Sequence, residues 1–171
     1  TVRYYIELIT GERFLNNCLN ALIYAFGSAI VAISIGVVLA WIVERTNTPF
    51  KHWVLILSIV SLGIPSVLYT ISFLMLLGKA GPVNQLLMVL LGSEEPLLNV
   101  YSLWGMIIVE GIEFAPLSFL LLSSVFRSTD ASFEEASMMS GANIFQTFNN
   151  ITFKLAMPGI LALIILIFIR A

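Results

Sequence analysis

The chain has 171 residues, of which 59% are hydrophobic and 11% charged; its net charge is −2 and its mean hydropathy is +1.00. Soluble domains carry about 25% charged residues, so this composition indicates a membrane protein. The absence of a basic block excludes the usual electrostatic basis of nucleic-acid binding. The single cysteine, Cys18, and the single histidine, His52, cannot build a disulfide framework or a Cys/His metal site.

The first predicted element is a membrane span over residues 15–43. Residues 14–43 form a run of 30 without a charge, and a spanning helix needs about 20. Within this run small residues recur at every fourth position, where they would let two helix backbones approach closely in lipid. We therefore predict a helix-packing face, with chance in an Ala/Gly-rich helix as the alternative. Its residues are Ser28, Ala32, Gly36 and Ala40.

The second predicted span covers residues 53–78, which carry no charge. It contains Gly63-Ile64-Pro65, where a kink is expected because proline removes a backbone donor. Such a kink could act as a hinge or simply bend the helix. Residues 83–91 follow between two Gly/Pro turns and are too short to span. They predict an interfacial or re-entrant helix, with an ordinary loop as the alternative.

The third predicted span, residues 98–126, contains Pro116 as a second candidate kink and two acids, Glu110 and Glu113. The acids are three positions apart and share a helical face. A charge near the bilayer centre costs about 2.5–3.5 kcal/mol, so such residues usually face a bundle interior or a water-filled path. They could attract cations along a pathway, paired with Arg170. They could equally form an internal ion pair or be protonated and hydrogen-bonded between helices. Two carboxylates alone do not make a metal site, so no metal is predicted.

The fourth predicted span is 155–171. Its 15 uncharged residues reach only about 22 Å as a helix, short of the roughly 30 Å hydrocarbon core. We therefore expect a C-terminally truncated fragment whose last helix continues. Together the elements predict an all-α, polytopic transmembrane bundle: one domain, 1–171, with four spans, an interfacial helix and one large loop, 128–152.

Charge orients the spans by a narrow margin. The positive-inside rule places the side with more Lys and Arg in the cytoplasm. That side carries loop 128–152, which we therefore expect to be cytoplasmic. Its cations are Arg45, Lys51, Arg127 and Lys154; those on the opposite side are Arg3, Arg13 and Lys79.

The loop 128–152 contains signals for a short helix over residues 133–140. Ser132 and Glu135 have the spacing of a capping box, and Gly141 stands where a helix C-terminal glycine is expected. A second short helix or turn is predicted over 144–150. A loop that only joined two spans would not need this partly apolar surface, so the loop predicts a docking site for a partner protein.

This loop resembles the EAA loop of permease subunits of binding-protein-dependent ABC importers. Their motif reads E-A-A, three residues, G, nine residues, I-x-L-P. Phe153 replaces the leucine and Lys154 the first proline, so Pro158 is expected to supply the proline at the start of the next helix. The ATPase-coupling residues that the resemblance implies are Ser132, Glu135, Ala136, Ser137, Gly141, Ala142, Ile151 and Pro158.

Other segments resemble the ferric-iron-type branch of the same family, and polyamine, thiamine and phosphonate importers look similar there. The first span opens with Asn17-x-x-Asn20-Ala21-Leu22 and closes with Ala40-Trp41-x-Val43-Glu44-Arg45-Thr46. Gly81-Pro82-Val83-Asn84 follows on the outside. The resemblance therefore implies ferric iron as substrate, with a polyamine, thiamine or a phosphonate as alternatives.

The resemblance also implies the machinery around the chain. Two permease domains, in separate or fused chains, would form the pathway in the lipid of a bacterial inner membrane. A periplasmic or lipoprotein substrate-binding protein would deliver the substrate. A separate ATPase subunit would use ATP and Mg and receive residues 133–140 as the coupling helix. The chain itself is expected to bind no cofactor and to have no catalytic residues, because it lacks a P-loop pattern.

Three other classes of membrane protein are rivals to an importer permease. A secondary transporter would show inverted repeats, and none is convincing here. An intramembrane enzyme would need a catalytic pair within the membrane. A non-transporting membrane scaffold would need no ATPase. Copurification of an ATPase subunit would distinguish the importer from all three.

Overall fold

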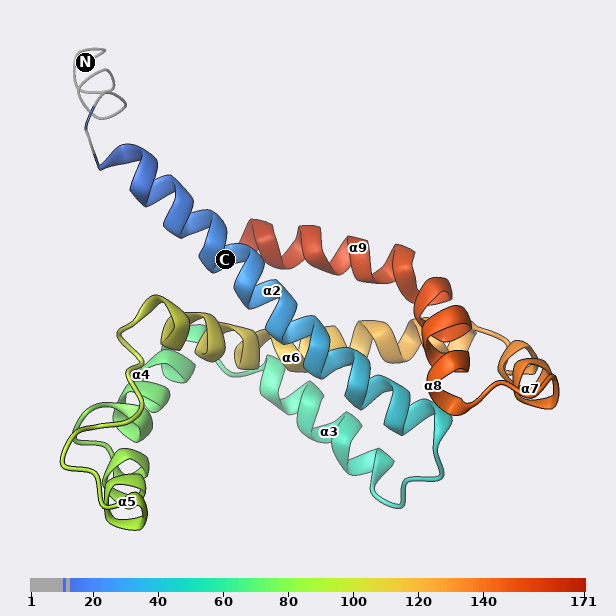
Figure 1. The fold of residues 1–171 in the computed structure, drawn as a ribbon, viewed down its shortest axis with the longest axis horizontal. Helices are drawn as coiled ribbons and strands as arrows, with labels where there is room; N and C mark the ends of the chain where they lie inside the picture. Colours follow the sequence, from blue (N-terminus) through green and yellow to red (C-terminus); the bar gives the residue numbers. More distant parts are fainter. Residues whose placement is uncertain (1–10, 12) are drawn as a thin grey trace.

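The computed structural model describes residue 11 and residues 13–171, so Arg3, used above for orientation, lies outside the described residues. The regular elements of the described part are helices, which confirms the expected all-α class (Figure 1). In chain order they are α2 (Phe14–Arg45), α3 (Lys51–Leu62), α4 (Ser66–Leu77), α5 (Pro82–Leu91), α6 (Leu103–Ser128), α7 (Ser132–Met139), α8 (Ile144–Thr147), the π-helix η1 (Phe148–Thr152) and α9 (Phe153–Arg170).

Four helical segments of the described chain are long and apolar enough to cross a membrane. They are Phe14–Arg45, Ser66–Leu91, Leu103–Ser128 and Ile144–Arg170. The second of these turns at Gly78–Gly81, where α4 ends and α5 begins. In length and composition the molecule is a multi-pass membrane protein.

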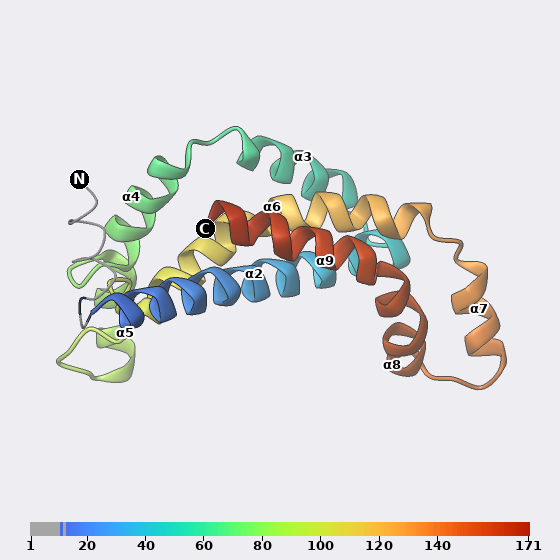
Figure 2. The same ribbon diagram turned by 90° about the horizontal axis from the view of Figure 1, so that it is seen from above.

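The core lies where α2, α6 and α9 pack against one another (Figures 1 and 2). The predicted small-residue face of α2 is confirmed: Ser28, Ala32 and Ala40 are fully buried. A Cβ on Gly36 would lie 2.6 Å from the Ser118 Cβ and 2.8 Å from the Ser118 carbonyl carbon. The backbones of α2 and α6 thus approach as closely as a glycine allows, and the two helices form one rigid pair.

The stretch 53–78 is two helices, which separate at the Gly63-Ile64-Pro65 sequence where a kink is predicted. α3 ends at Leu62 and α4 begins at Ser66, with Pro65 in an extended conformation (ψ 137°). Proline lacks an N–H and disfavours helical geometry in the residue before it, so Gly63-Ile64-Pro65 breaks the helix rather than bending it. Figure 2 shows α3 and α4 running in different directions on one side of α6.

The predicted helix over 83–91 is confirmed as α5, which starts with Pro82 and ends at the left-handed Gly92 (φ 65°). Asn84, in the first turn of α5, is fully buried. Its Nδ2 donates to the carbonyl oxygens of Leu77, Gly78 and Leu98 at 2.9–3.0 Å, and its Oδ1 accepts from the Leu98 N–H at 2.9 Å. One side chain therefore joins the end of α4, α5 and the segment that leads to α6.

The helix that leads into the fourth span begins at Ile144, and one expectation about it is wrong. Pro158 was expected to open the helix but lies inside α9. The helical run Ile144–Arg170 has 27 residues, of which α8 and η1 precede the span predicted over residues 155–171. A capping box supplies the start: Asn143 accepts from the Gln146 N–H and Gln146 accepts from the Asn143 N–H. This cap places the helix start well before the proline.

Candidate functional site

α7 and α8 lie together at one end of the molecule, opposite α4 and α5 (Figures 1 and 2). The start of α7 differs from the prediction. Ala131 is the N-cap, Ser132 is already helical, and the Ser132 N–H donates to Asp130 Oδ1 at 2.9 Å. That hydrogen bond lowers the pKa of the Asp130 carboxyl. The predicted Ser132–Glu135 capping box is therefore wrong, because Asp130 takes the role of first acceptor.

The end of α7 confirms the predicted helix stop at Gly141. The Ala142 N–H donates to the Ser137 carbonyl at 3.2 Å and the Gly141 N–H to the Met138 carbonyl at 3.0 Å. This pair of bonds is a Schellman motif, which requires a left-handed residue. Gly141 has φ +92°, a conformation that a glycine adopts without steric cost. The chain reverses tightly there and runs into α8.

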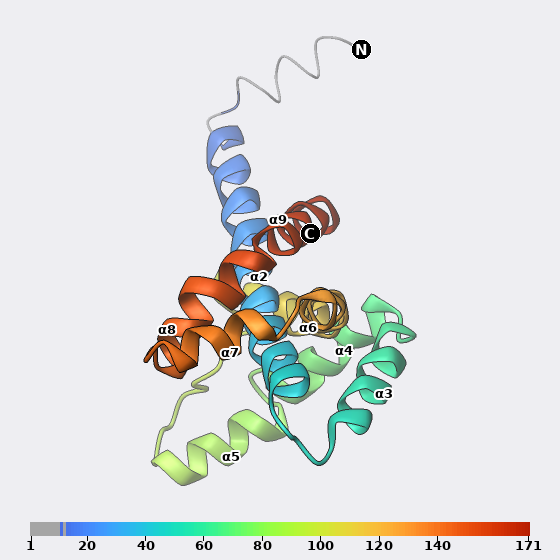
Figure 3. The ribbon, with the colours of Figure 1, turned by 90° about the vertical axis from the view of Figure 1, so that its right-hand side faces the viewer.

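A side-chain hydrogen bond holds α7 against α8. Ser137 Oγ lies 3.0 Å from Thr147 Oγ1, and Thr147 is buried. Ser137, which stands for the second alanine of the EAA motif, thus connects the two helices. Figure 3 shows α7 and α8 side by side in front of the core. With the cap at Asn143 and the stop at Gly141, the two helices form a rigid hairpin.

This hairpin exposes large apolar side chains, and we call its outer side the α7–α8 surface. Met139 is 90% exposed and Phe145 85%. In a segment predicted to lie outside the membrane, exposed apolar side chains of this size indicate an interaction site. Of the other predicted residues, Ala142 and Ile151 are half-buried, and Pro158 is exposed on α9, away from the hairpin. The members of the surface are Phe133, Glu135, Ala136, Met138, Met139, Ile144 and Phe145.

Glu134, the neighbour of the predicted Glu135, faces inward and is only 8% exposed. Its Oε1 accepts from Arg45 Nε at 2.9 Å and from Thr152 Oγ1 at 2.9 Å. Arg45 also donates from Nη2 to the Thr129 carbonyl at 3.2 Å. Sequence reasoning missed this residue, since Arg45 lies 89 positions earlier in the chain.

A second ion pair lies beside the first. Glu44 Oε1 accepts from Arg127 Nη2 at 2.8 Å and from Ser123 Oγ at 2.5 Å. The Arg127 side chain is 65% exposed. Two consecutive residues, Glu44 and Arg45, thus attach the end of α2 to α6 and to α7.

The two acids of α6 line separate cavities. Glu110 lines one of about 320 Å³ with Tyr24, Thr70 and Tyr101. Glu113 lines another of about 530 Å³ that also contains Arg170. The structure therefore brings Arg170 to the cavity of Glu113 and not to that of Glu110. Among the described residues no group of three or more His, Cys, Asp or Glu is placed to hold a metal ion.

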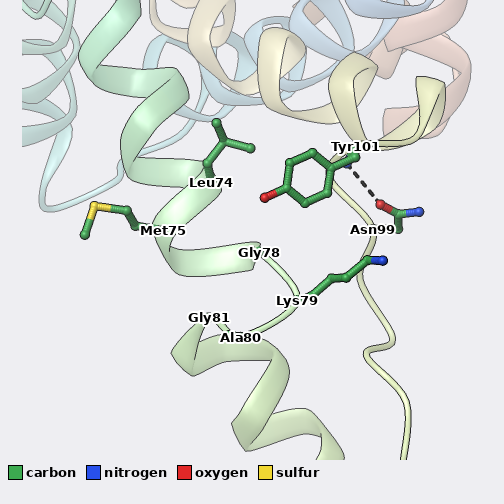
Figure 4. Close-up of a pocket in the computed structure, with 8 residues that line it drawn as sticks. All are labelled: Leu74, Met75, Gly78, Lys79, Ala80, Gly81, Asn99 and Tyr101. Carbon is green, nitrogen blue, oxygen red and sulfur yellow. Dashed lines mark hydrogen bonds between the residues drawn. The ribbon is translucent and has the colours of Figure 1, made fainter.

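An open cavity of about 710 Å³ lies at the α4–α5 end (Figure 4). It is formed by the α4–α5 turn on one side and the segment before α6 on the other. Lys79 and Tyr101 supply its longest polar side chains, and the Tyr101 N–H donates to Asn99 Oδ1 at 3.1 Å. The full lining is Leu74, Met75, Gly78, Lys79, Ala80, Gly81, Asn99 and Tyr101.

The spanning helices define a multi-pass membrane protein. The family described as "Binding-protein-dependent transport system inner membrane component" matches residues 32–171, and the chain belongs to this family.

Two of its relatives are named for different substrates. The putative 2-aminoethylphosphonate transport system permease protein PhnU of Salmonella typhimurium is 30% identical over 159 residues, covering 91% of this chain and 55% of the relative. The ferric transport system permease protein FbpB of Actinobacillus pleuropneumoniae is 29% identical over 168 residues, covering 98% of this chain and 23% of the relative.

A third relative is archaeal. The probable molybdenum ABC transporter permease protein of Haloferax volcanii is 30% identical over 163 residues, covering 95% of this chain and 57% of the relative. The chain spans about half the length of the phosphonate and molybdenum relatives and about a quarter of the ferric one.

Proposed function

We propose that this chain is a membrane-spanning permease domain of an ATP-driven importer, and that its α7–α8 surface binds the ATPase subunit. The observation that carries the proposal is the rigid hairpin that displays Met139 and Phe145 to the outside. It coincides with the segment that resembles the EAA loop. Its cap, its Schellman turn and the Ser137–Thr147 bond hold the surface in one shape, and preorganisation of this kind lowers the cost of binding a partner.

The partner of this surface is a protein rather than lipid. A helix that lies on a membrane carries Lys and Arg on its polar face, which attract anionic lipids. Residues 131–150 contain no Lys or Arg and carry two acids, Glu134 and Glu135. Anionic lipid headgroups would repel the exposed Glu135, whereas an ATPase cleft with basic side chains would favour it.

In the proposed mechanism the chain is a transport subunit and catalyses no reaction itself. ATP and Mg bind to the partner ATPase, whose closure moves α7. A second permease domain, in a separate or fused chain, completes the pathway. A periplasmic or lipoprotein substrate-binding protein delivers substrate at the α4–α5 end, and α7 lies in the cytoplasm of a bacterial cell. The helices then alternate between inward-open and outward-open arrangements as rigid bodies.

We propose ferric iron as the substrate. The ferric relatives match 98% and 100% of this chain. Glu110 and Glu113 would attract a cation along the pathway, and oxygen ligands suit hard cations. A polyamine or thiamine would be attracted by the same charges. A phosphonate is favoured instead by the PhnU relatives and by Arg170 at the Glu113 cavity. Uptake of labelled ferric iron, with the double variant Glu110→Gln/Glu113→Gln, distinguishes them: loss of iron uptake supports the ferric proposal.

Copurification tests the proposal as a whole. An ATPase subunit should copurify with the native chain. Glu135→Arg should abolish both association and uptake while the protein still inserts. Glu95→Arg reverses an exposed charge in the segment between α5 and α6 and should leave ATPase association unchanged. Normal ATPase association in Glu135→Arg would refute the docking assignment. The absence of any ATPase with the native chain would favour a secondary transporter or a non-transporting scaffold.

A further inference from the structure

We propose that the Glu134–Arg45 ion pair transmits the movement of α7 to the membrane-spanning helices. This inference rests on the proposed function and names the residues that would act behind the docking surface. Glu134 and Arg45 are positioning residues in this scheme, because neither one belongs to the α7–α8 surface.

The first observation is that one carboxylate joins three separate elements. Glu134 belongs to the first turn of α7, Arg45 is the last residue of α2, and Thr152 is the last residue of η1. Both partners bind the same oxygen, Oε1, at 2.9 Å. A displacement of α7 therefore reaches α2 and the start of α9 through a single atom.

The second observation is the burial of the pair. The side chains of Arg45 and Glu134 are 12% and 11% exposed, respectively. Charges held away from water interact strongly, and removing one partner leaves the other uncompensated. An exposed ion pair contributes little. The Arg45 guanidinium is also rigid and planar, and it donates to both Glu134 and the Thr129 carbonyl. The pair is therefore expected to keep α7 and the end of α2 together when α7 moves in either direction.

The third observation is that two neighbouring acids, Glu134 and Glu135, lie on different sides of α7. Successive residues of an α-helix point about 100° apart. Glu135 is exposed on the outer side of α7, whereas Glu134 is buried against Arg45 and Thr152. A force applied on the outer face thus has a direct route through the helix to the inner ion pair.

The fourth observation is the close packing of α2, the helix that ends at Arg45, against α6. α2 packs against α6 along its small-residue face, where a Cβ at Gly36 would meet the backbone of α6 at 2.8–2.9 Å. Such close packing leaves no room for α2 to slide independently. Displacement at Arg45 is therefore passed to α2 and α6 together. The covalent route from α7 to α6 runs through residues 129–131, a short non-helical segment, and is less direct.

The complete transporter, with its ATPase subunit and binding protein, provides the test. Glu134→Gln and Arg45→Gln remove the ion pair, and Arg45→Lys keeps the charge but loses the planar fork. Arg127→Gln is the matched control, since it breaks the neighbouring Glu44–Arg127 pair, which joins α2 to α6 and leaves α7 untouched. Cys18, exposed near the far end of α2, takes a spin label once the cysteines of the other subunits are replaced.

Two quantities are measured for each variant. The first is the amount of ATPase subunit that copurifies. The second is the change in the EPR spectrum of the Cys18 spin label, called the signal below, when a non-hydrolysable ATP analogue is added. In Glu134→Gln and Arg45→Gln we expect association within about twofold of the native level. We expect the ATP-dependent signal to fall at least about fivefold, the low end of measured coupling between sites. Arg45→Lys should be intermediate, and Arg127→Gln should respond like the native chain.

A native-size signal in Glu134→Gln would overturn the inference and leave the proposed function intact. Loss of ATPase association in both Glu134→Gln and Arg45→Lys would also overturn it, because the pair would then build the docking surface rather than transmit its movement. Failure of the native chain to bind an ATPase would refute the proposed function itself.

Discussion

The turn at Gly141 gives the sharpest test of how the docking hairpin is built. Its φ is +92°, and a Cβ placed there would meet nothing within 4 Å. The cost of a substitution within this chain is therefore conformational and not steric. A left-handed conformation costs an ordinary L-residue about 1–2 kcal/mol, and asparagine tolerates it better. Alanine can relieve this strain in the free permease by leaving the native turn, and ATPase binding must then restore it. Since 1.4 kcal/mol is a factor of ten in an equilibrium, Gly141→Ala should weaken ATPase binding by up to about 5- to 30-fold.

The series Gly141→Ala, Gly141→Asn and Gly141→Asp separates the backbone from the partner. Titration of the purified permease with ATPase subunit measures the affinity. If only the backbone matters, Gly141→Asn should lose less than Gly141→Ala. If the partner presses on this position, Asn should be the worse of the two, and Gly141→Asp, with a charge, should abolish binding and uptake. Gly92→Ala places the same strain (φ +65°) at the α4–α5 end and should leave ATPase affinity unchanged. Native affinity in Gly141→Ala would refute the reasoning.

Three further predictions concern packing and hydrogen bonding. Gly36→Ala should lower the free energy of unfolding by about 1–3 kcal/mol, because its Cβ would meet the α6 backbone. Gly159→Ala should lower it less, because its Cβ would meet only the Val125 side chain, at 2.9 Å. Thermal unfolding in detergent compares the two variants. Asn84→Ala removes the hydrogen bonds to the Leu77 carbonyl and to the Leu98 carbonyl and N–H. Each buried group left unpaired costs about 1–3 kcal/mol, so limited proteolysis between α4 and α6 should become faster. Ser137→Ala removes one bond worth about 1 kcal/mol, and hydrogen exchange in α7 should accelerate.

Features with a short-range cause could be predicted from the sequence. The small-residue face of α2 follows from a four-residue spacing, and that spacing alone places the four residues on one side of a helix. Gly141 ends α7 because no other residue type adopts a positive φ as readily. α5 follows from the Gly81-Pro82 start and the Gly92 stop. In each case the residues that produce the structure are neighbours in the chain.

Where two neighbouring residues could each define a helix N-terminus, the sequence alone does not determine which of them does so. Ser132 and Asp130 are both good N-terminal acceptors, and Asp130 takes the hydrogen bond. Pro158 suits the first turn of a helix, yet Asn143 and Gln146 start that helix earlier. The Asn-x-x-Gln spacing was visible and could have identified this capping box. A proline can then lie within the helix, where only one backbone bond is lost.

Pairs between residues far apart in the chain could not be predicted. They determine which of the two adjacent acids of α7 is buried and which is exposed. Nothing local distinguishes Glu134 from Glu135, since both lie in the first turn of α7. The distinction arises because Arg45 and Thr152 approach α7 from one side only. The separation of Glu110 from Glu113 into two cavities has the same origin: it depends on which helices pack beside α6.

The two ion pairs at the end of α2 limit how this helix can move. Glu44 binds α6 through Ser123 and Arg127, and Arg45 binds α7. Since the two side chains leave the helix about 100° apart, rotation of α2 about its own axis would break at least one of the pairs. Sliding is opposed by the close contact at Gly36. Tilting of α2 together with α6 keeps both pairs and the packing face intact. Movement of α7 should therefore displace α2 and α6 as one body.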